Sequence, residues 1–394
     1  MQQSPSIEEA QPLASRRAQI WLVSAAVALY WISLYLYVPT LPVYAEDRIG
    51  DLELVGVVLS MYGLWQAVVR LPLGIVADWV GRRKPFILLG FALSALGAWM
   101  MATSDSYLGL LLGRGVTGLS AAAWVPLSVL FAGLFPPKDA VRAAGLLSLV
   151  NLGSRIFATS INGKLNDWGG YGLAFFLAMG VAVAAALVTL PVHERPRAPR
   201  IPSVRETGRL ITRGDVLLPA LMAAVGQYIS WATIFGFVPI LARNLGATDT
   251  VVSMMVSLNL LISMGGNLIT TAFGKRIGNM RLVYVSYAMM AVGMGVAAVA
   301  GSLWVVILAQ AIIGLGGGIG SPLTMGMSIE KVDDEQRATA MGLHQAVYAI
   351  GMFAGPWLSG ILAERMDIQP MFGVTAIAGF VLSLLMARIM EKGR

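Results

Sequence analysis

Hydrophobic residues fill most of the chain in long runs that short polar segments interrupt. A helix needs about 20 apolar residues to cross the roughly 30 Å hydrocarbon core of a bilayer. Twelve runs meet this length, at 19–43, 53–77, 84–103, 107–135, 140–164, 171–192, 217–242, 250–273, 282–300, 303–328, 338–363 and 370–390. The pattern predicts an all-α membrane protein with twelve transmembrane helices.

The two halves of the chain repeat each other. Trp31 precedes Val38-Pro39 at the same spacing at which Trp231 precedes Val238-Pro239. At separations of 196 or 197 residues, further pairs match: Gly81 with Gly278, Arg114 with Gln310, Pro126 with Pro322, Gly145 with Gly342, and Gly163 with Gly360. Internal repeats of this kind are typical of transporters built from two halves around a central site. We therefore expect two pseudo-symmetric six-helix bundles, 19–193 and 217–390, with an N-terminal tail (1–18) and a linker (194–216).

Basic residues predict the orientation. If both termini and the linker face the cytoplasm, the cytoplasmic segments hold 21 of the 28 Lys and Arg residues. The opposite face then keeps Arg48, Lys164, Arg243 and Arg365. By the positive-inside rule, both termini and the linker are expected in the cytoplasm and the protein in the cytoplasmic (inner) membrane.

Composition narrows the function classes. The chain of 394 residues is 57% hydrophobic and 12% charged, with a mean hydropathy of +0.73, which is outside the range of soluble domains. The net charge of +7 is explained by topology and does not indicate nucleic-acid binding. Cysteine is absent and only His193 and His344 are present, so we expect no disulfide, metal site or cofactor. The polar first 18 residues show no signal-peptide cleavage pattern.

A motif follows the second predicted span. Arg70-Leu-Pro-Leu-Gly74-Ile-Val-Ala-Asp78-Trp-Val-Gly81-Arg82-Arg83-Lys84 closely resembles the loop signature of the major facilitator superfamily. The resemblance implies that Asp78 faces the start of span 11, where helix amide groups favour negative charge, with Arg337 as a further partner. It also implies that Gly74 allows close helix approach. The alternative is that Asp78 only neutralises the neighbouring basic residues.

Two other motifs refine the resemblance. Arg114-Gly-Val-Thr-Gly118 on span 4 is similar to the family motif whose arginine lines the cavity and influences proton coupling; a static partner for backbone carbonyls is the alternative. The antiporter motif expected on span 5 is degraded, whereas span 11 carries Gly342, Gly351, Gly355-Pro356 and Gly360 at that spacing. Close helix packing explains these glycines equally well. Taken together, the motifs are most similar to those of the twelve-span drug:proton antiporter branch of the superfamily.

Polar and aromatic residues recur at helical spacing on several spans and identify cavity-lining faces. The candidate substrate-binding residues are Arg114, Arg155, Asn151, Tyr30, Tyr37, Trp124, Gln227, Trp231, Asn259, Gln310, Gln345 and Tyr348. The candidate conformational and coupling residues are Gly74, Asp78, Gly81, Arg82, Arg114, Arg337 and His344. For any single polar or aromatic residue, helix packing is an equally good reading.

Arg155 lies near the middle of span 5, one turn after Asn151, and the family pattern does not require it. All 21 acidic residues fall in loops or near span ends, so neither Arg114 nor Arg155 has a carboxylate at membrane depth. An anionic or zwitterionic substrate would satisfy them. We expect a non-enzymatic, monomeric transporter that binds a small molecule and protons within the lipid bilayer and exports its substrate. The alternatives are uptake or exchange of organic anions, or a membrane sensor or enzyme on the same fold.

Overall fold

The computed structural model describes residues 13–136, 139–194, 208, 210–333 and 336–392, and all regular structure in these residues is helical. The N-terminal half contains α1 (Leu13–Tyr35), α2 (Leu41–Ile49), α3 (Leu52–Val80), α4 (Lys84–Thr103), α5 (Tyr107–Ala121), α6 (Trp124–Ala132) and α7 (Ala140–Thr189). The C-terminal half contains α9 (Gly214–Ala232), the π-helical turn η2 (Thr233–Phe237), α10 (Val238–Asn244), α11 (Asp249–Ile277), α12 (Asn279–Ala298), α13 (Leu303–Ile329), α14 (Arg337–Met366) and α15 (Ile368–Lys392). Most of the expected tail and linker lies outside the described residues.

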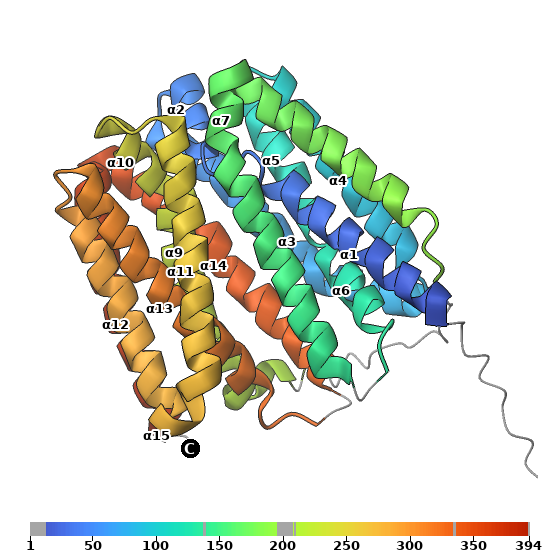
Figure 1. Cartoon of the computed structure of the whole chain (residues 1–394). Coiled ribbons are helices and arrows are strands. Elements are labelled where there is room, and N and C mark those ends of the chain that lie inside the picture. The colour runs from blue at the N-terminus through green and yellow to red at the C-terminus, as the bar shows by residue number, and fades with distance from the viewer. Residues whose placement is uncertain (1–12, 137–138, 195–207, 209, 334–335, 393–394) are drawn as a thin grey trace, which may run out of the picture.

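Helix α7 contains two crossings. Eleven described helices are long and apolar enough to span a membrane, and one of them extends over 48 residues. At 1.5 Å per residue this length is about twice the bilayer thickness. The backbone leaves helical geometry at Gly169 (φ −145°) and Gly170 (φ 68°), and the chain reverses there (Figure 1). Glycine permits the positive φ that this reversal requires. The prediction of twelve crossings is confirmed.

Three predicted spans are interrupted. Residues 36–40 separate α1 from α2, and η2 separates α9 from α10, so the repeated Val-Pro pairs lie at corresponding breaks in the two halves. Pro39 and Pro239 lack the backbone N–H of a helix interior, and Gly236 has non-helical torsions (φ −119°, ψ −105°). The predicted span 107–135 is likewise divided into α5 and α6. Hydrophobicity identified these spans as single helices because it does not report local backbone geometry.

The helices of the two halves lie side by side as two groups (Figure 1). The main contacts between the groups join α3 to α14 and α7 to α11. We call the end at which α7 finishes and α9 begins the linker end, and the opposite end, at which α3 and α11 begin, the far end. In each of these two contacts, one helix (α3 or α11) begins at the far end. Its partner in the other half (α14 or α7) reaches the same end.

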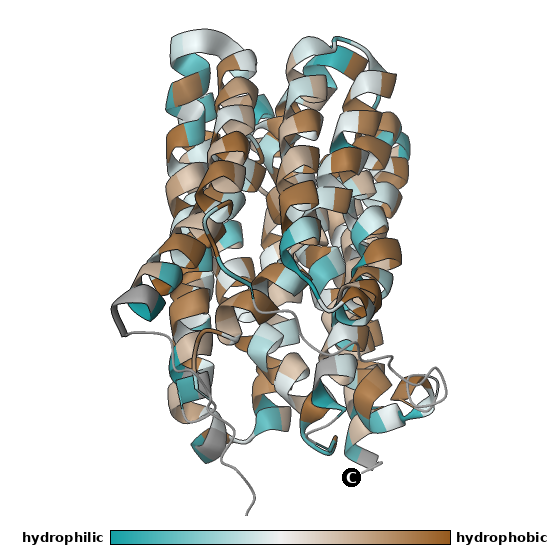
Figure 2. Cartoon of the chain, turned by 90° about the vertical axis from the view of Figure 1, so that its right-hand side faces the viewer, coloured by the Kyte–Doolittle hydropathy of each residue, from teal (hydrophilic) through white to brown (hydrophobic). Residues whose placement is uncertain are grey.

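Large apolar side chains cover the outside of the helices. Leu149, Leu268 and Ile377 are 64%, 61% and 70% exposed, and hydrophobic positions recur along the height of the helices in Figure 2. A continuous apolar exterior of this kind requires lipid contact. The chain is therefore a multi-pass membrane protein.

Glycines repeat as packing positions in both halves. A Cβ added at Gly118 would press on the backbone of Tyr62, and one added at Gly314 would press on Asn259. Gly351, Gly355 and Gly360 on α14 similarly contact α9 and α3. The glycine pattern of span 11 thus lies at close helix contacts.

Candidate functional site

Arg114 on α5 is enclosed by aromatic rings. Its side chain is 1% exposed, and its Cζ lies 4.2 Å from the ring centroid of Tyr62 and 5.9 Å from that of Trp231. The Nε and Nη1 atoms have no hydrogen-bond partner among the described residues. The Tyr37 hydroxyl is likewise buried without a hydrogen-bond partner among the described residues. Ring faces therefore supply most of the stabilisation of this charge.

Arg155 on α7 lies in a second aromatic setting. Its Cζ is 4.3 Å from the centroid of Tyr35 and 5.7 Å from that of Trp31. Arg155 is only partly buried, and within the described residues its Nε is buried without a partner. The ion pairs of the described chain are formed by other arginines, namely Arg48, Arg83, Arg213 and Arg243. Arg155 therefore presents a guanidinium that no carboxylate of the described chain neutralises.

Both aromatic settings cross between the halves. Tyr62 stacks on Trp231 with centroids 5.1 Å apart and an interplanar angle of 22°. Tyr35 meets Phe235 edge-on, with centroids 5.9 Å apart. Each arginine thus lies on the N-terminal ring of a pair whose other ring belongs to the C-terminal half. Movement of the halves against each other would change the surroundings of both cations.

Arg70 on α3, the first residue of the loop motif, is a third membrane-depth cation and was not among the predicted site residues. It is 3% exposed, and it donates from Nη1 to the Tyr348 hydroxyl (2.7 Å) and from Nη2 to Gln66 Oε1 (2.7 Å). Its bond to Tyr348 joins the two halves. The sequence signal for this site was an arginine within an apolar span, four residues after Gln66 and therefore on the same helix face.

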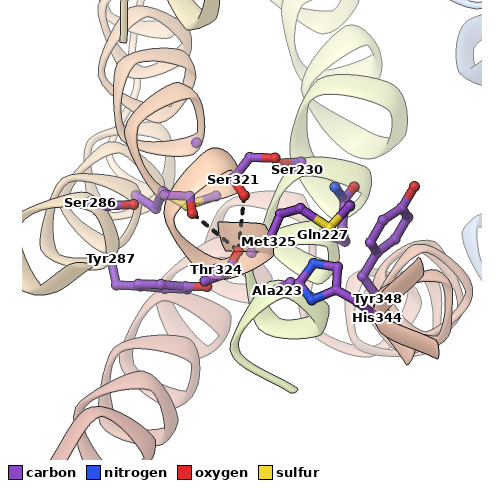
Figure 3. Close-up of a pocket in the computed structure, with 14 residues that line it drawn as sticks. Ala223, Gln227, Ser230, Ser286, Tyr287, Ser321, Thr324, Met325, His344 and Tyr348 are labelled. Carbon is purple, nitrogen blue, oxygen red and sulfur yellow. Dashed lines mark hydrogen bonds between the residues drawn. The ribbon is translucent and has the colours of Figure 1, made fainter. Parts of the chain in front are cut away.

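A polar pocket of about 70 Å³ lies within the C-terminal half. Figure 3 shows its lining side chains converging from α9, α12, α13 and α14. Its polar lining residues are Gln227, Ser230, Ser286, Tyr287, Ser321, Thr324, His344 and Tyr348. Gln227 and Tyr348 were predicted site residues, whereas the serines and Thr324 were not, because serine and threonine are common in membrane helices.

His344 lies at one side of this pocket and is 2% exposed. Its Nδ1 is 2.7 Å from Ser328 Oγ, and Ser328 in turn donates to the Val216 carbonyl at 3.2 Å. The imidazole ring meets Tyr348 edge-on at 5.8 Å. The structure therefore brings His344 together with Tyr348 and, through it, with Arg70.

Several predicted site residues contact other protein groups. Asn259 donates to the Gln310 carbonyl (2.7 Å) and to Gln310 Oε1 (3.0 Å), and both residues are buried between α11 and α13. Tyr30 donates to the Ser120 carbonyl at 3.0 Å, and Trp124 packs on Trp31 with centroids 5.1 Å apart. These contacts fit the helix-packing alternative in this conformation. Asn151 and Gln345 are partly buried, and the Gln345 Oε1 atom has no partner in the described chain.

The loop after α3 is held within its own half. Asp78 accepts a hydrogen bond from Arg83 at 2.6 Å, and Gly81 ends the helix with a positive φ of 69°. Glu194 accepts from the backbone N–H groups of Arg83 (2.6 Å) and Lys84 (2.8 Å). Its charge thereby caps the start of α4. Arg82 is exposed.

The expected approach of α3 to α14 is located elsewhere on the helix. A Cβ added at Gly74 would meet Val125 of α6 at 3.4 Å, whereas one at Gly56 or Gly63 would clash with the backbone of α14. The closest contact between these helices is thus near the far end. Neither Glu194 nor this far-end contact was identified from sequence, because both depend on segments distant along the chain.

Two acidic residues join the halves at the far end. Glu364 on α14 accepts from the Leu52 backbone N–H at 2.8 Å, and Asp167 on α7 accepts from Thr250 Oγ1 at 2.8 Å. The two sites are related by the repeat, since Asp167 and Glu364 are 197 positions apart. Beside them, Asn166 donates to both Thr40 (2.9 Å) and Asp249 (2.9 Å). We call Glu364, Asp167 and their two donors, the Leu52 backbone N–H and the Thr250 hydroxyl, the far-end latch.

Comparisons with known proteins agree with this architecture. The chain is 23% identical over 381 residues to an uncharacterized MFS-type transporter, MJ1560, of Methanocaldococcus jannaschii, covering 93% of this chain and 96% of the relative. It is 21% identical over 388 residues to the quinolone resistance protein NorA of Staphylococcus aureus, again covering 93% and 96%. A bacterial homologue of the human lysosomal transporter Spinster, solved in an inward-facing and unoccupied conformation, superimposes with a TM-score of 0.77 at 15% identity over 98% of this chain and 99% of that one. Residues 23–225 and 220–393 each match the Major Facilitator Superfamily. The chain therefore belongs to the Major Facilitator Superfamily and is a transporter by family and fold.

Proposed function

We propose that this protein exports a small organic anion across the cytoplasmic membrane in exchange for protons. It would work as a monomer, in which the bundles 19–193 and 217–390 rock about a central site. The main support for an anionic substrate is the pair Arg114 and Arg155. Both lie at membrane depth on aromatic rings, and neither has a carboxylate partner in the described chain. A cationic substrate would meet repulsion there, whereas an anion would meet two compensating charges.

The aromatic rings suit an anion with an apolar body. Arginine holds a carboxylate, sulfonate or phosphate with two parallel hydrogen bonds. The rings of Trp31, Tyr35 and Trp231 are buried in this conformation. When the halves move apart, they would offer flat apolar surface for the rest of the molecule. Arg155 is the first contact in this conformation, because Arg114 is enclosed.

The linker end is assigned to the cytoplasm by the excess of Lys and Arg in its segments. The latch and the close contact of α3 with α14 then close the external side. This arrangement corresponds to an inward-facing state, in which an exporter would collect its substrate from the cytoplasm.

His344 is the proposed proton carrier. A serine has one hydroxyl hydrogen, and Ser328 directs it to the Val216 carbonyl. The hydrogen between His344 and Ser328 then belongs to Nδ1, which leaves Nε2 as a free proton acceptor. His344 contacts Ser328 and Tyr348, and Arg70 donates to the Tyr348 hydroxyl. The polar groups that line the pocket with His344 include Gln227, Tyr287 and Thr324. A proton on His344 would repel Arg70 and thereby disfavour the contact between halves.

Transport into proteoliposomes tests the proposal. Vesicles with an acidic interior, a trapped pH dye and a potassium–valinomycin clamp receive 2-naphthalenesulfonate, which cannot cross as a neutral acid. Antiport predicts that internal pH rises on addition, whereas symport predicts that it falls. Arg155→Gln should abolish the response, and His344→Gln should remove the pH change but retain naphthalenesulfonate exchange. His193→Gln is the matched control, because His193 is the other histidine and is exposed. Transport of ethidium with no response to the sulfonate would overturn the anion assignment, and a falling internal pH would replace export by uptake.

A further inference from the structure

We infer that the pocket of the C-terminal half binds an uncharged, hydroxyl-bearing part of the substrate, so that the transported anion is a hydroxylated one such as a sugar acid or its conjugate. This inference rests on the proposed anion transport and specifies the substrate class. It concerns the polar pocket between α9, α12, α13 and α14.

Polar side chains, glycines, Ala223 and two methionines line the pocket, and none of these residues is Asp, Glu, Lys or Arg. Gln227, Ser230 and Ser321 point polar atoms toward it, and these three side chains form no hydrogen bond with other described residues. An amide and two hydroxyls together offer both donors and acceptors. In a membrane interior such groups carry a free-energy cost unless water or a ligand satisfies them.

Other lining groups are already satisfied and shape the wall. Ser286 donates to the Gly316 carbonyl at 2.8 Å, Tyr287 donates to the Met222 carbonyl, and Thr324 donates to carbonyls of its own helix at 3.1 Å. Glycines at 226, 317 and 320 also line the space. A Cβ at Gly320 would collide with Ser286 Oγ, so this glycine allows α13 to approach α12 behind the pocket. The hydroxyl and amide groups without a protein partner thus lie on the α9 and α13 walls, while α14 contributes the free Nε2 of His344.

The size and position of the pocket define what it holds. A volume of about 70 Å³ admits several hydroxyl groups but not a whole drug-sized molecule, since one water needs roughly 10–15 Å³ on this measure. Tyr348 lines the pocket and also accepts the hydrogen bond from Arg70. A ligand whose hydroxyls occupy the pocket therefore lies next to a cation contributed by the other half. The pocket thus adjoins Arg70 through Tyr348, whereas the anionic group itself is assigned to Arg155.

Equilibrium dialysis with three fluorescent probes tests the inference on the full-length protein in detergent. The probes are 4-methylumbelliferyl glucuronide (charge and hydroxyls), 4-methylumbelliferyl glucoside (hydroxyls only) and 4-methylumbelliferyl oxyacetate (charge only). The glucuronide should bind about tenfold more tightly than either of the others. Gln227→Ala and Ser321→Ala should each weaken glucuronide binding about 3- to 10-fold and leave oxyacetate binding unchanged. Ser128→Ala is the control, because Ser128 bonds its own helix on α6.

The outcomes separate this inference from the function on which it rests. If neither anion binds, or if Arg155→Gln leaves both affinities unchanged, anion transport itself is wrong. If both anions bind with equal affinity and neither pocket variant changes the glucuronide affinity, the pocket is not a substrate subsite although the anion assignment stands. Unchanged oxyacetate binding in each variant establishes that it is folded, and Ser230→Ala provides a third variant if one of the others fails to fold.

Discussion

Arg114 lies with its guanidinium carbon 4.2 Å above the ring centroid of Tyr62, which stacks on Trp231 of the other half at 5.1 Å. The repeat places Gln310 and Asn259 at the corresponding positions, and there an amide donates to an amide at 3.0 Å. One packing site therefore holds a cation over a ring in one half and a neutral hydrogen bond in the other. A cation at this depth costs about 2.5–3.5 kcal/mol, and a desolvated cation–π contact returns about 2 kcal/mol. The ring thus offsets most of this cost without a carboxylate partner and leaves the positive charge unneutralised.

Replacement of Arg155 should distinguish charge from packing. Arg155→Ala should lower the initial rate of 2-naphthalenesulfonate transport at least about tenfold, since a charged hydrogen bond contributes about 1.5–3 kcal/mol. Arg155→Lys should retain part of the rate, because it keeps the charge and loses the planar fork. Arg388→Ala, at an exposed arginine of α15, should have no effect. Equal rates in all three variants would assign Arg155 to helix packing.

The far-end latch should set the balance between conformations. Glu364→Gln and Asp167→Asn each remove a negative charge from a helix start, which contributes about 0.3–1 kcal/mol, so the double variant should favour far-end opening several-fold. The readout is alkylation of Ser257→Cys, because Ser257 is 6% exposed and bonds Thr159 across the halves. Glu53→Gln, an exposed acid in the same first turn of α3, is the control. Identical alkylation rates in all variants would contradict a latch.

Asp78→Asn tests the loop motif in the opposite conformation. In the present state Asp78 binds Arg83; when the linker end closes, we expect it to face the start of α14 beside Arg337. The variant should therefore favour the present state, slow turnover and leave substrate affinity unchanged. Transport rate, probe binding and Ser257→Cys alkylation measure the three effects. An unchanged transport rate and an unchanged alkylation rate would show that Asp78 only neutralises the basic residues of its own loop.

Topology can be tested directly because the chain contains no cysteine. Arg82→Cys at the linker end and Lys164→Cys near the far end replace exposed residues. An impermeant maleimide added to intact cells should label position 164 and not position 82. The reverse pattern would invert the orientation and, with it, the assignment of the inward-facing state.

Glu46 on α2 should make stability depend on pH. Burial, followed by the like charge of Asp47, raises the pKa of its carboxyl, although Arg243 opposes the shift. The folded state therefore binds this proton more tightly than the unfolded state, and stability falls as pH rises above the unfolded pKa of 4.5. The melting temperature of the native chain should decrease more between pH 4.5 and 7.5 than that of Glu46→Gln. Parallel curves would indicate that Glu46 is ionised without a free-energy cost in the folded protein.

The sequence predicts the twelve membrane crossings, but it does not predict which residues of the candidate site contact each other. Hydrophobic length alone predicted twelve crossings, two of which follow each other in α7 and are separated by the non-helical Gly169 and Gly170. Helical spacing also placed Asn259 and Gln310 on polar faces, but their hydrogen bonds to each other depend on which helices are neighbours. The periodicity of polar residues identifies the polar face of a helix, but it does not identify the helix that packs against that face.

The sequence by itself determined the class of the protein, because burial of apolar length in lipid and the distribution of basic residues are local, additive properties of the chain. The tertiary structure decided which cations meet which rings, why Arg70 joins Tyr348, and that Glu364 and Asp167 close the far end as a symmetric pair. Each of these contacts joins residues separated by 52 to 312 positions, from Arg114 with Tyr62 to Leu52 with Glu364. Such contacts follow from helix packing across two halves, which no local pattern specifies.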